Sequence, residues 1–269
     1  MQLVAISDLH IGYPANRRAL EALPAFTDDW LIVAGDVGDS VRQIEFVWRL
    51  LVERFARVIW TPGNHDLWTL PIDPRALRGV AHYEQLVEIS RRHGVVTPED
   101  PYLVWPGEGP PTVIAPVFLL YDYSFRPDHV PEDQALAWAA EKDLVCADEL
   151  LLHPDPYASR SEWCRARGAM TEQRLRDVPD SHMVVLVNHF PLRQDLAVLP
   201  RIPRFSIWCG TRLTNDWHTR FRARVVVSGH LHIRSTSWRD EVRFEEVSLG
   251  YPRQWNAEKG MEGYLRRIL

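Results

Sequence analysis

Five stretches of this chain share one design, in which a short apolar run ends at residues that can bind a metal ion. The candidate ligands after these runs are Asp8, His10, Asp36, Asn64, His189, His230 and His232. Carboxylate, amide and imidazole groups without thiolates suit Mn²⁺, Fe²⁺/Fe³⁺ or Zn²⁺. One polar residue at a loop end is ordinary, whereas a cluster of this size indicates a metal or catalytic site.

The number of candidate ligands favours two metal ions over one, because seven ligands exceed what a single site uses. A carboxylate shared between two cations would hold them about 3.5 to 4 Å apart, which is the spacing of two-metal hydrolytic sites. Asp36, at the end of the apolar run 31–35, is the residue we expect to be shared.

The apolar runs predict β-strands that are buried on both faces, because they are continuous and rich in β-branched residues. We expect these strands at 2–7, 31–35, 57–61, 112–120, 183–187, 225–228 and 242–248. Helices are expected at 18–23, from Ser40 onward, and after Asp73-Pro74 up to His93. Ser40 and Gln43 have the spacing of a capping box, which marks the start of the second of these helices. Strands that alternate with helices predict an α/β fold with a parallel sheet, whose functional loops lie at the carboxyl ends of the strands.

Composition limits the class of protein. A length of 269 residues suits one large domain, and 46% hydrophobic with 25% charged residues excludes a disordered chain. The net charge of -5 argues against a general binder of nucleic acid or membrane surfaces. No apolar run is long enough to span a bilayer and the start of the chain has no signal-peptide pattern, so we expect a cytoplasmic protein without a membrane partner. The three cysteines form no Cys-x-x-Cys pair, so neither a disulfide framework nor a zinc-thiolate site is indicated.

Five short motifs, in order, resemble the signature blocks of the calcineurin-like metallophosphoesterases. They are Asp8-x-His10, Gly35-Asp36-x-x-Asp39, Gly63-Asn64-His65-Asp66, Asn188-His189 and Gly229-His230-x-His232. The resemblance implies two facing mixed β-sheets flanked by helices, in a single domain of residues 1–269. It leaves 67–187 unmatched, and within that part residues 121–180, helical and acidic in composition, are a candidate helical cap or insertion.

The same resemblance implies a role for each matched residue. One metal ion would be held by Asp8, His10, Asp36 and His232, and the other by Asp36, Asn64, His189 and His230. His65 would assist the leaving group or stabilise phosphoryl charge, and Asp39 would orient it. A water between two cations loses a proton near neutral pH, so the implied activity is hydrolysis of a phosphoester by a bridging hydroxide.

Finer features of the sequence narrow the range of possible substrates. Ser40 and Asp66 stand where Ser/Thr protein phosphatases carry arginine and glutamate, which argues against that class. The segments 206–211, 216–220 and 243–253 resemble an actinobacterial subgroup that includes a 4'-phosphopantetheinyl hydrolase. This implies a phosphodiester on an acyl or peptidyl carrier protein as the favoured substrate. The alternatives are a phosphodiesterase or nuclease acting on nucleotides, a small-molecule phosphomonoesterase, and a non-catalytic scaffold, which would have no use for the intact ligand set.

A basic segment lies between two of the ligand-bearing strands. Residues 193–224 hold seven arginines against two aspartates, an excess of five positive charges. A solvated surface loop is the simpler interpretation of such a run. The alternative is a surface that meets a phosphate or an acidic partner, for which Arg204, Arg212 and His218 are the candidate substrate contacts.

Overall fold

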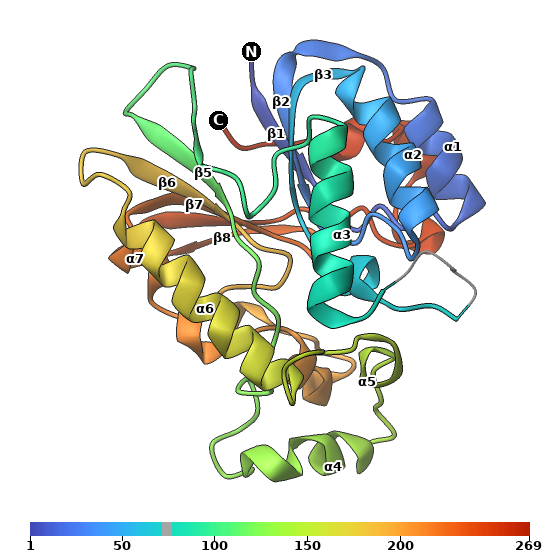
Figure 1. Cartoon of the computed structure of the whole chain (residues 1–269), viewed down its shortest axis with the longest axis vertical. Coiled ribbons are helices and arrows are strands. Elements are labelled where there is room, and N and C mark those ends of the chain that lie inside the picture. The colour runs from blue at the N-terminus through green and yellow to red at the C-terminus, as the bar shows by residue number, and fades with distance from the viewer. Residues whose placement is uncertain (72–76) are drawn as a thin grey trace.

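The computed structural model, which describes residues 1–71 and 77–269, contains two mixed β-sheets that face each other with helices outside them (Figure 1). The first sheet has the order β10-β1-β2-β3 and the second the order β4-β5-β6-β7-β9-β8. The strands of the first sheet are β1 (Leu3–Ile6), β2 (Phe26–Ala34), β3 (Phe55–Thr61) and β10 (Arg266–Arg267). Those of the second are β4 (Leu103–Val104), β5 (Thr112–Pro116), β6 (Met183–Val187), β7 (Ala223–Ser228), β8 (Ser235–Arg239) and β9 (Val242–Glu246). The predicted fold class is confirmed.

The strands are parallel where they carry the predicted motifs. β1, β2 and β3 pair in parallel, as do β5, β6, β7 and β9, whereas β10, β4 and β8 are antiparallel edge strands. Side chains alternate between the two faces of each strand. Leu3 and Ala5 therefore pack between the sheets with Val185 and Val225, while Val4 and its neighbours on the other face pack under the helices.

Helices cover the outer faces of both sheets. The α-helices are α1 (Pro14–Glu21), α2 (Val41–Val52), α3 (Gly79–Arg92), α4 (Ala135–Ala140), α5 (Asp148–Leu151), α6 (Arg160–Arg176) and α7 (Trp217–Arg220). The 3₁₀ helices are η1 (His65–Leu67), η2 (Glu132–Gln134), η3 (Gln194–Leu196), η4 (Pro203–Trp208), η5 (Arg212–Thr214), η6 (Pro252–Gln254), η7 (Ala257–Lys259) and η8 (Glu262–Tyr264). In the described ranges, no helix combines the length and apolar character needed to cross a bilayer.

Several boundaries differ from the predicted ones for physical reasons. The fifth strand ends at Pro116, although the chain up to residue 120 stays buried. The edge strand β8 was not predicted, because its side chains are mostly exposed and show no apolar alternation. Ser40 is the N-cap of α2 but its side chain makes no capping hydrogen bond, and Gln43 accepts the N–H of Asp39 rather than that of Ser40, so the predicted capping box does not form. The expected start of the next helix after Asp73-Pro74 lies outside the described residues.

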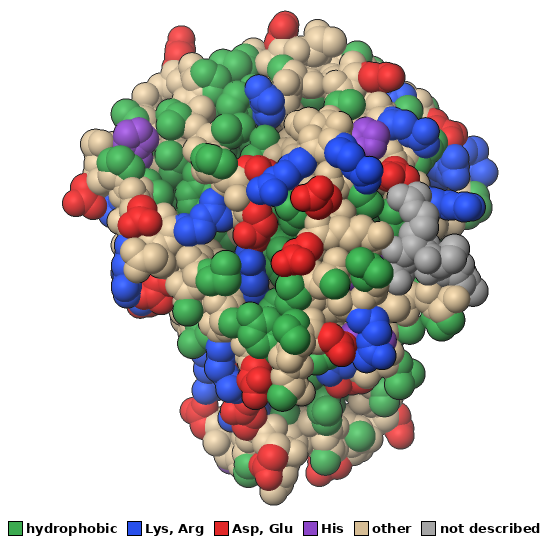
Figure 2. Space-filling view, viewed as in Figure 1, with side chains coloured by type: hydrophobic (Ala, Val, Ile, Leu, Met, Phe, Trp, Pro, Cys, Tyr) green, Lys and Arg blue, Asp and Glu red, His purple; other side chains and the backbone are tan. Residues whose placement is uncertain are grey.

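Residues 121–180 contain η2, α4, α5 and α6. In Figure 1, α4 lies below both sheets and α6 lies along the second sheet. Leu175 of α6 joins the apolar cluster on the outer face of that sheet, with Val113 and Val184. Over the face shown in Figure 2, basic and acidic side chains are interspersed and do not form one large patch of a single sign.

Candidate metal centre

The two sheets meet at the carboxyl ends of their parallel strands, where the predicted ligands lie. A parallel bridge between Ser7 and Ser248 links the chain after β1 to the chain after β9. Three overlapping groups of possible ligands have their atoms within 4.8 Å of one another. The groups are Asp8, His10 and His232; His10, Asp36 and His65; and Asp36, His189 and His230.

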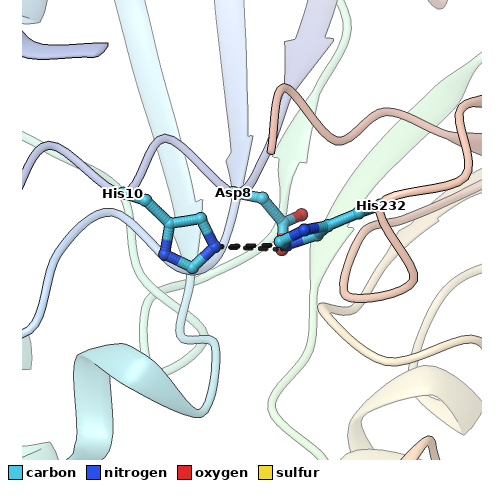
Figure 3. A group of neighbouring side chains, drawn as sticks. All are labelled: Asp8, His10 and His232. Carbon is cyan, nitrogen blue, oxygen red and sulfur yellow. Dashed lines mark hydrogen bonds and ion pairs between the residues drawn. The ribbon is translucent and has the colours of Figure 1, made fainter. Parts of the chain in front are cut away.

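The first group joins the loop after β1 to the loop after β7, as Figure 3 shows. His232 Nε2 lies 2.9 Å from Asp8 Oδ1 and 3.2 Å from His10 Nε2. The other oxygen of Asp8 accepts hydrogen bonds from Ser7 Oγ at 2.6 Å and Ser248 Oγ at 2.7 Å. One carboxylate oxygen is thus fixed by hydroxyl groups, and the other faces the two imidazoles.

Asp36 lies between the first group and the third. Its Oδ1 accepts the backbone N–H of His65 at 2.9 Å. Its Oδ2 lies 3.4 Å from His189 Nε2 and 3.8 Å from His10 Nε2. A single oxygen of Asp36 therefore faces histidines of both predicted ligand sets, which is the position a shared ligand requires.

The third group has ring nitrogens that point inward. His189 donates from Nδ1 to the Ala34 carbonyl at 2.8 Å, which leaves Nε2 facing Asp36 and, at 3.2 Å, Asn64 Oδ1. His230 Nε2 is buried and has no hydrogen-bond partner among the residues described. A buried nitrogen without a partner is costly unless something binds it. An unpaired imidazole nitrogen beside the carboxylate of Asp36 fits a metal ion.

The backbone at these positions is unusual. Five of the predicted ligands have φ in the left-handed region, namely Asp8 at 54°, His10 at 42°, Asp36 at 52°, His230 at 72° and His232 at 53°. Residues other than glycine rarely adopt this conformation, and such strain clusters at functional sites. Neighbouring glycines make room for the carboxylates, since a Cβ on Gly63 would overlap Asp36 and one on Gly229 would overlap Asp8.

The electrostatics also suit cations. Burial lowers the pKa of His10 to about 4 and that of His230 to about 3, so both rings are neutral, as metal ligands must be. Burial opposes the charged form of Asp36, but the charges of His189 and His65 outweigh it and keep its pKa below the usual range. Burial likewise opposes protonation of His189, yet Asp36 raises its pKa to about 10, which shows how negative this pocket is.

His65 and Asp39 form a pair beside these groups. His65 Nδ1 donates to Asp39 Oδ1 at 2.7 Å, and its ring stacks on Trp68 with 3.7 Å between the ring centroids. Burial would lower the pKa of His65, but the charge of Asp36 and the hydrogen bond to Asp39 raise it to about 9. His65 is therefore protonated at neutral pH.

Comparison with known proteins agrees with this geometry. The model of the calcineurin-like phosphoesterase family matches residues 1–234. The chain belongs to that family. The acyl-carrier-protein phosphodiesterase PptH of Mycobacterium tuberculosis is 49% identical over 269 residues, which are 99% of this chain and 83% of PptH. A crystal structure of PptH superposes with a TM-score of 0.95 at 48% identity, covering 100% of this chain and 95% of that one. The chain is thus a metal-dependent phosphoesterase, and the alternative of a non-catalytic scaffold is not supported.

The centre of this phosphoesterase opens into a cavity of about 350 Å³. Its lining includes the polar residues Asp36, Asn64, His65, His230 and His232. The lining also includes the apolar residues Val145, Leu199, Ile202, Phe205 and Leu231. The cavity therefore combines groups that can bind a phosphoryl group with a surface that can bind an apolar chain.

Sequence reasoning missed several residues that hold the phosphoesterase site in place. Asp66 accepts the N–H groups of Val37 at 2.8 Å, Gly38 at 3.2 Å and Gly63 at 2.9 Å, and so joins the loops after β2 and β3. Its position directly after His65 was the available signal. Gln254 accepts from His232 Nδ1 at 2.8 Å, and no spacing pattern pointed to it.

The predicted substrate contacts have other partners in the structure. Arg204 binds the Trp138 carbonyl and, at 2.7 Å, Glu141, while Arg212 pairs with Asp128 at 2.6 Å. The buried His218 lies 2.8 Å from Asp240 Oδ2. Arg204, Arg212 and His218 are not among the residues that line the cavity at the centre. Their role in substrate binding stays a prediction.

Proposed function

We propose that this enzyme uses two metal ions to hydrolyse the phosphodiester that joins 4'-phosphopantetheine to an acyl or peptidyl carrier protein. The observation that carries the proposal is the position of Asp36 Oδ2, which faces the histidines of two predicted ligand sets in a cavity lined by both polar and apolar residues. The similarity to PptH, named as an acyl-carrier-protein phosphodiesterase, supports the choice of substrate.

The proposed ligand sets follow from which side chains converge. Asp8, His10, Asp36 and His232 would hold one ion, and Asp36, Asn64, His189 and His230 the other. Two such cations, when bound, make a water nucleophilic near neutral pH and offset the charge of the phosphoryl group. Oxygen and imidazole ligands are compatible with Mn, Fe or Zn, so metal analysis must identify the ions.

His65 is the proposed catalytic residue of the chain itself. Because its Nδ1–H is held by Asp39, its Nε2 can carry the second proton toward the bound phosphodiester. Hydrolysis breaks the bond between phosphorus and the seryl oxygen of the carrier, and that oxygen must gain a proton as it leaves. His65 would first stabilise negative charge on the phosphoryl group and then supply this proton to the leaving oxygen.

The walls of the cavity favour a carrier protein over a nucleotide. Val145 is 80% exposed and Ile202 is 39% exposed, so apolar surface reaches the rim, where a flexible pantetheine arm and its carrier can both contact it. Arg201 and Arg253 adjoin lining residues, are exposed and have no ion pair within the described part of the chain. Such arginines would complement an acidic carrier surface.

The test incubates the metal-loaded enzyme in parallel with holo carrier protein, a dinucleotide and a cyclic nucleotide, and follows the masses of the products. We expect conversion of holo to apo carrier protein, lost on chelation and restored by Mn²⁺ or Fe²⁺. The variant His65→Ala should keep its metals and lose about 10²- to 10⁴-fold in turnover. Holo carrier protein that stays intact while a nucleotide is cleaved would overturn the proposed substrate.

A further inference from the structure

We propose that Asp148 is a positioning residue that fixes the amide of Asn64 with its oxygen toward the second metal ion. The inference rests on the proposed two-ion function. Asp148 is the first residue of α5 and is fully buried. Its Oδ1 accepts from Asn64 Nδ2 at 3.0 Å and from Trp68 Nε1 at 2.7 Å, and its Oδ2 accepts from Tyr121 Oη at 3.1 Å.

The orientation of Asn64 needs an external group to set it. The two ends of an asparagine amide have nearly the same shape, but only the oxygen can accept a hydrogen bond or bind a cation. A carboxylate accepts and cannot donate, so Asp148 binds the NH₂ end and turns the oxygen inward. Asn64 Oδ1 accordingly lies 3.2 Å from His189 Nε2, inside the second ligand set.

The same carboxylate oxygen reaches His65 through Trp68. The Trp68 indole donates to Asp148 and stacks on the His65 ring, with 3.7 Å between the centroids. Asp148 itself belongs to the segment 121–180, which the family motifs in the sequence do not cover. Arg160 of α6 donates to the Asp148 carbonyl at 2.7 Å and so anchors this end of α5. Asp148 therefore connects the segment 121–180 directly to Asn64 and, through Trp68, to His65.

The hydrogen bonds predict which substitutions of Asp148 are tolerated. In Asp148→Asn, the amide oxygen can accept from Asn64 and Trp68 while the NH₂ group donates to Tyr121, because a phenol oxygen can also accept. In Asp148→Ala, nothing accepts from the NH₂ group of Asn64, and only the contact between its oxygen and His189 is left to orient the amide. Tyr121→Phe is the matched control, since it removes a bond to Asp148 and leaves Asn64 held.

The experiment is a calorimetric titration of Mn²⁺ into chelator-treated wild type and these three variants, with turnover of bis-(p-nitrophenyl) phosphate measured alongside. We expect Asp148→Ala to bind one of its two ions about 10- to 100-fold more weakly, the usual effect of losing a group that orients a ligand. Asp148→Asn and Tyr121→Phe should bind both ions much as wild type does. If Asp148→Ala does not fold, as judged by circular dichroism, Asp148→Leu is titrated in its place, with the same expected loss, because leucine has a similar shape and no hydrogen-bond acceptor.

Two results would overturn the inference. One is wild-type affinity for both ions in the alanine or leucine variant, and the other is an equal loss in Asp148→Asn, which would make the charge decisive and the orientation irrelevant. Either result, seen beside a wild type that binds two ions and is active, leaves the proposed function standing. A wild type that binds fewer than two ions would instead refute the proposed function and, with it, this inference.

Discussion

Replacing Asp39 by asparagine should shift the pH dependence of catalysis without removing a metal ligand. The pKa of His65 is about 9, raised by the charge of Asp36 and by the hydrogen bond to Asp39 at 2.7 Å. A hydrogen bond to a charged group contributes about 1.5 to 3 kcal/mol, and one pKa unit corresponds to about 1.4 kcal/mol. The side chain of Asp39 is 34% exposed, so water screens the pair and the lower limit applies. The pKa of His65 should therefore fall by about 1 unit in Asp39→Asn.

The assay is the pH profile of turnover on bis-(p-nitrophenyl) phosphate with saturating metal. His65 is active while protonated, so the descending alkaline limb should move to lower pH by about one unit in Asp39→Asn. Metal content should equal that of wild type. Asp180→Asn, which neutralises an aspartate that is 99% exposed and pairs with Arg222, controls for the change in net charge. If the alkaline limb does not move in Asp39→Asn, the assigned role of Asp39 is refuted. If the alkaline limb also moves in Asp180→Asn, the change in net charge explains the shift.

Two further substitutions test the centre and the scaffold. In Asp36→Asn the amide oxygen should keep the bond to the N–H of His65, which turns the NH₂ group toward the histidines of both sets. Both ions should then bind more weakly. Undiminished affinity for two ions, measured by elemental analysis, would contradict the shared role of Asp36. Glu99→Gln should lower the free energy of unfolding at pH 7 by about 1 to 3 kcal/mol, because Glu99 accepts from Tyr83 and the buried Arg167, both at 2.6 Å. Burial would raise the pKa of Glu99, but the charge of Arg167 outweighs burial and holds the pKa below the usual range of a glutamate. This stability is therefore present above that range and is lost on acidification. Urea unfolding curves of the two proteins should converge at low pH, and a gap that persists there would argue against the charged pair.

The sequence predicted which side chains converge at the ends of the strands better than it predicted the residues around them, and topology explains the difference. Parallel strands end at one edge of a sheet, so a motif such as Asp8-x-His10 after an apolar run can be assigned to that edge without knowing any contact. Asp148 offers no such signal. It lies 84 residues after Asn64 along the chain, and only the packing of α5 brings the two together. The exposed edge strand β8 was missed for a similar reason, because the pairing with β9 defines it and its own side chains do not.

The left-handed backbone conformation of the loops that carry the predicted ligands explains why many other residues are needed to hold these few side chains in place. A residue other than glycine in the left-handed region costs about 1 to 2 kcal/mol, so the five predicted ligands that adopt it store about 5 to 10 kcal/mol. That sum is comparable to the whole stability of a typical domain. The loops keep this conformation only because other contacts fix them, such as the three backbone N–H groups that Asp66 accepts and the hydroxyl groups of Ser7 and Ser248 on Asp8. These supporting residues should therefore be as sensitive to substitution as the ligands they hold.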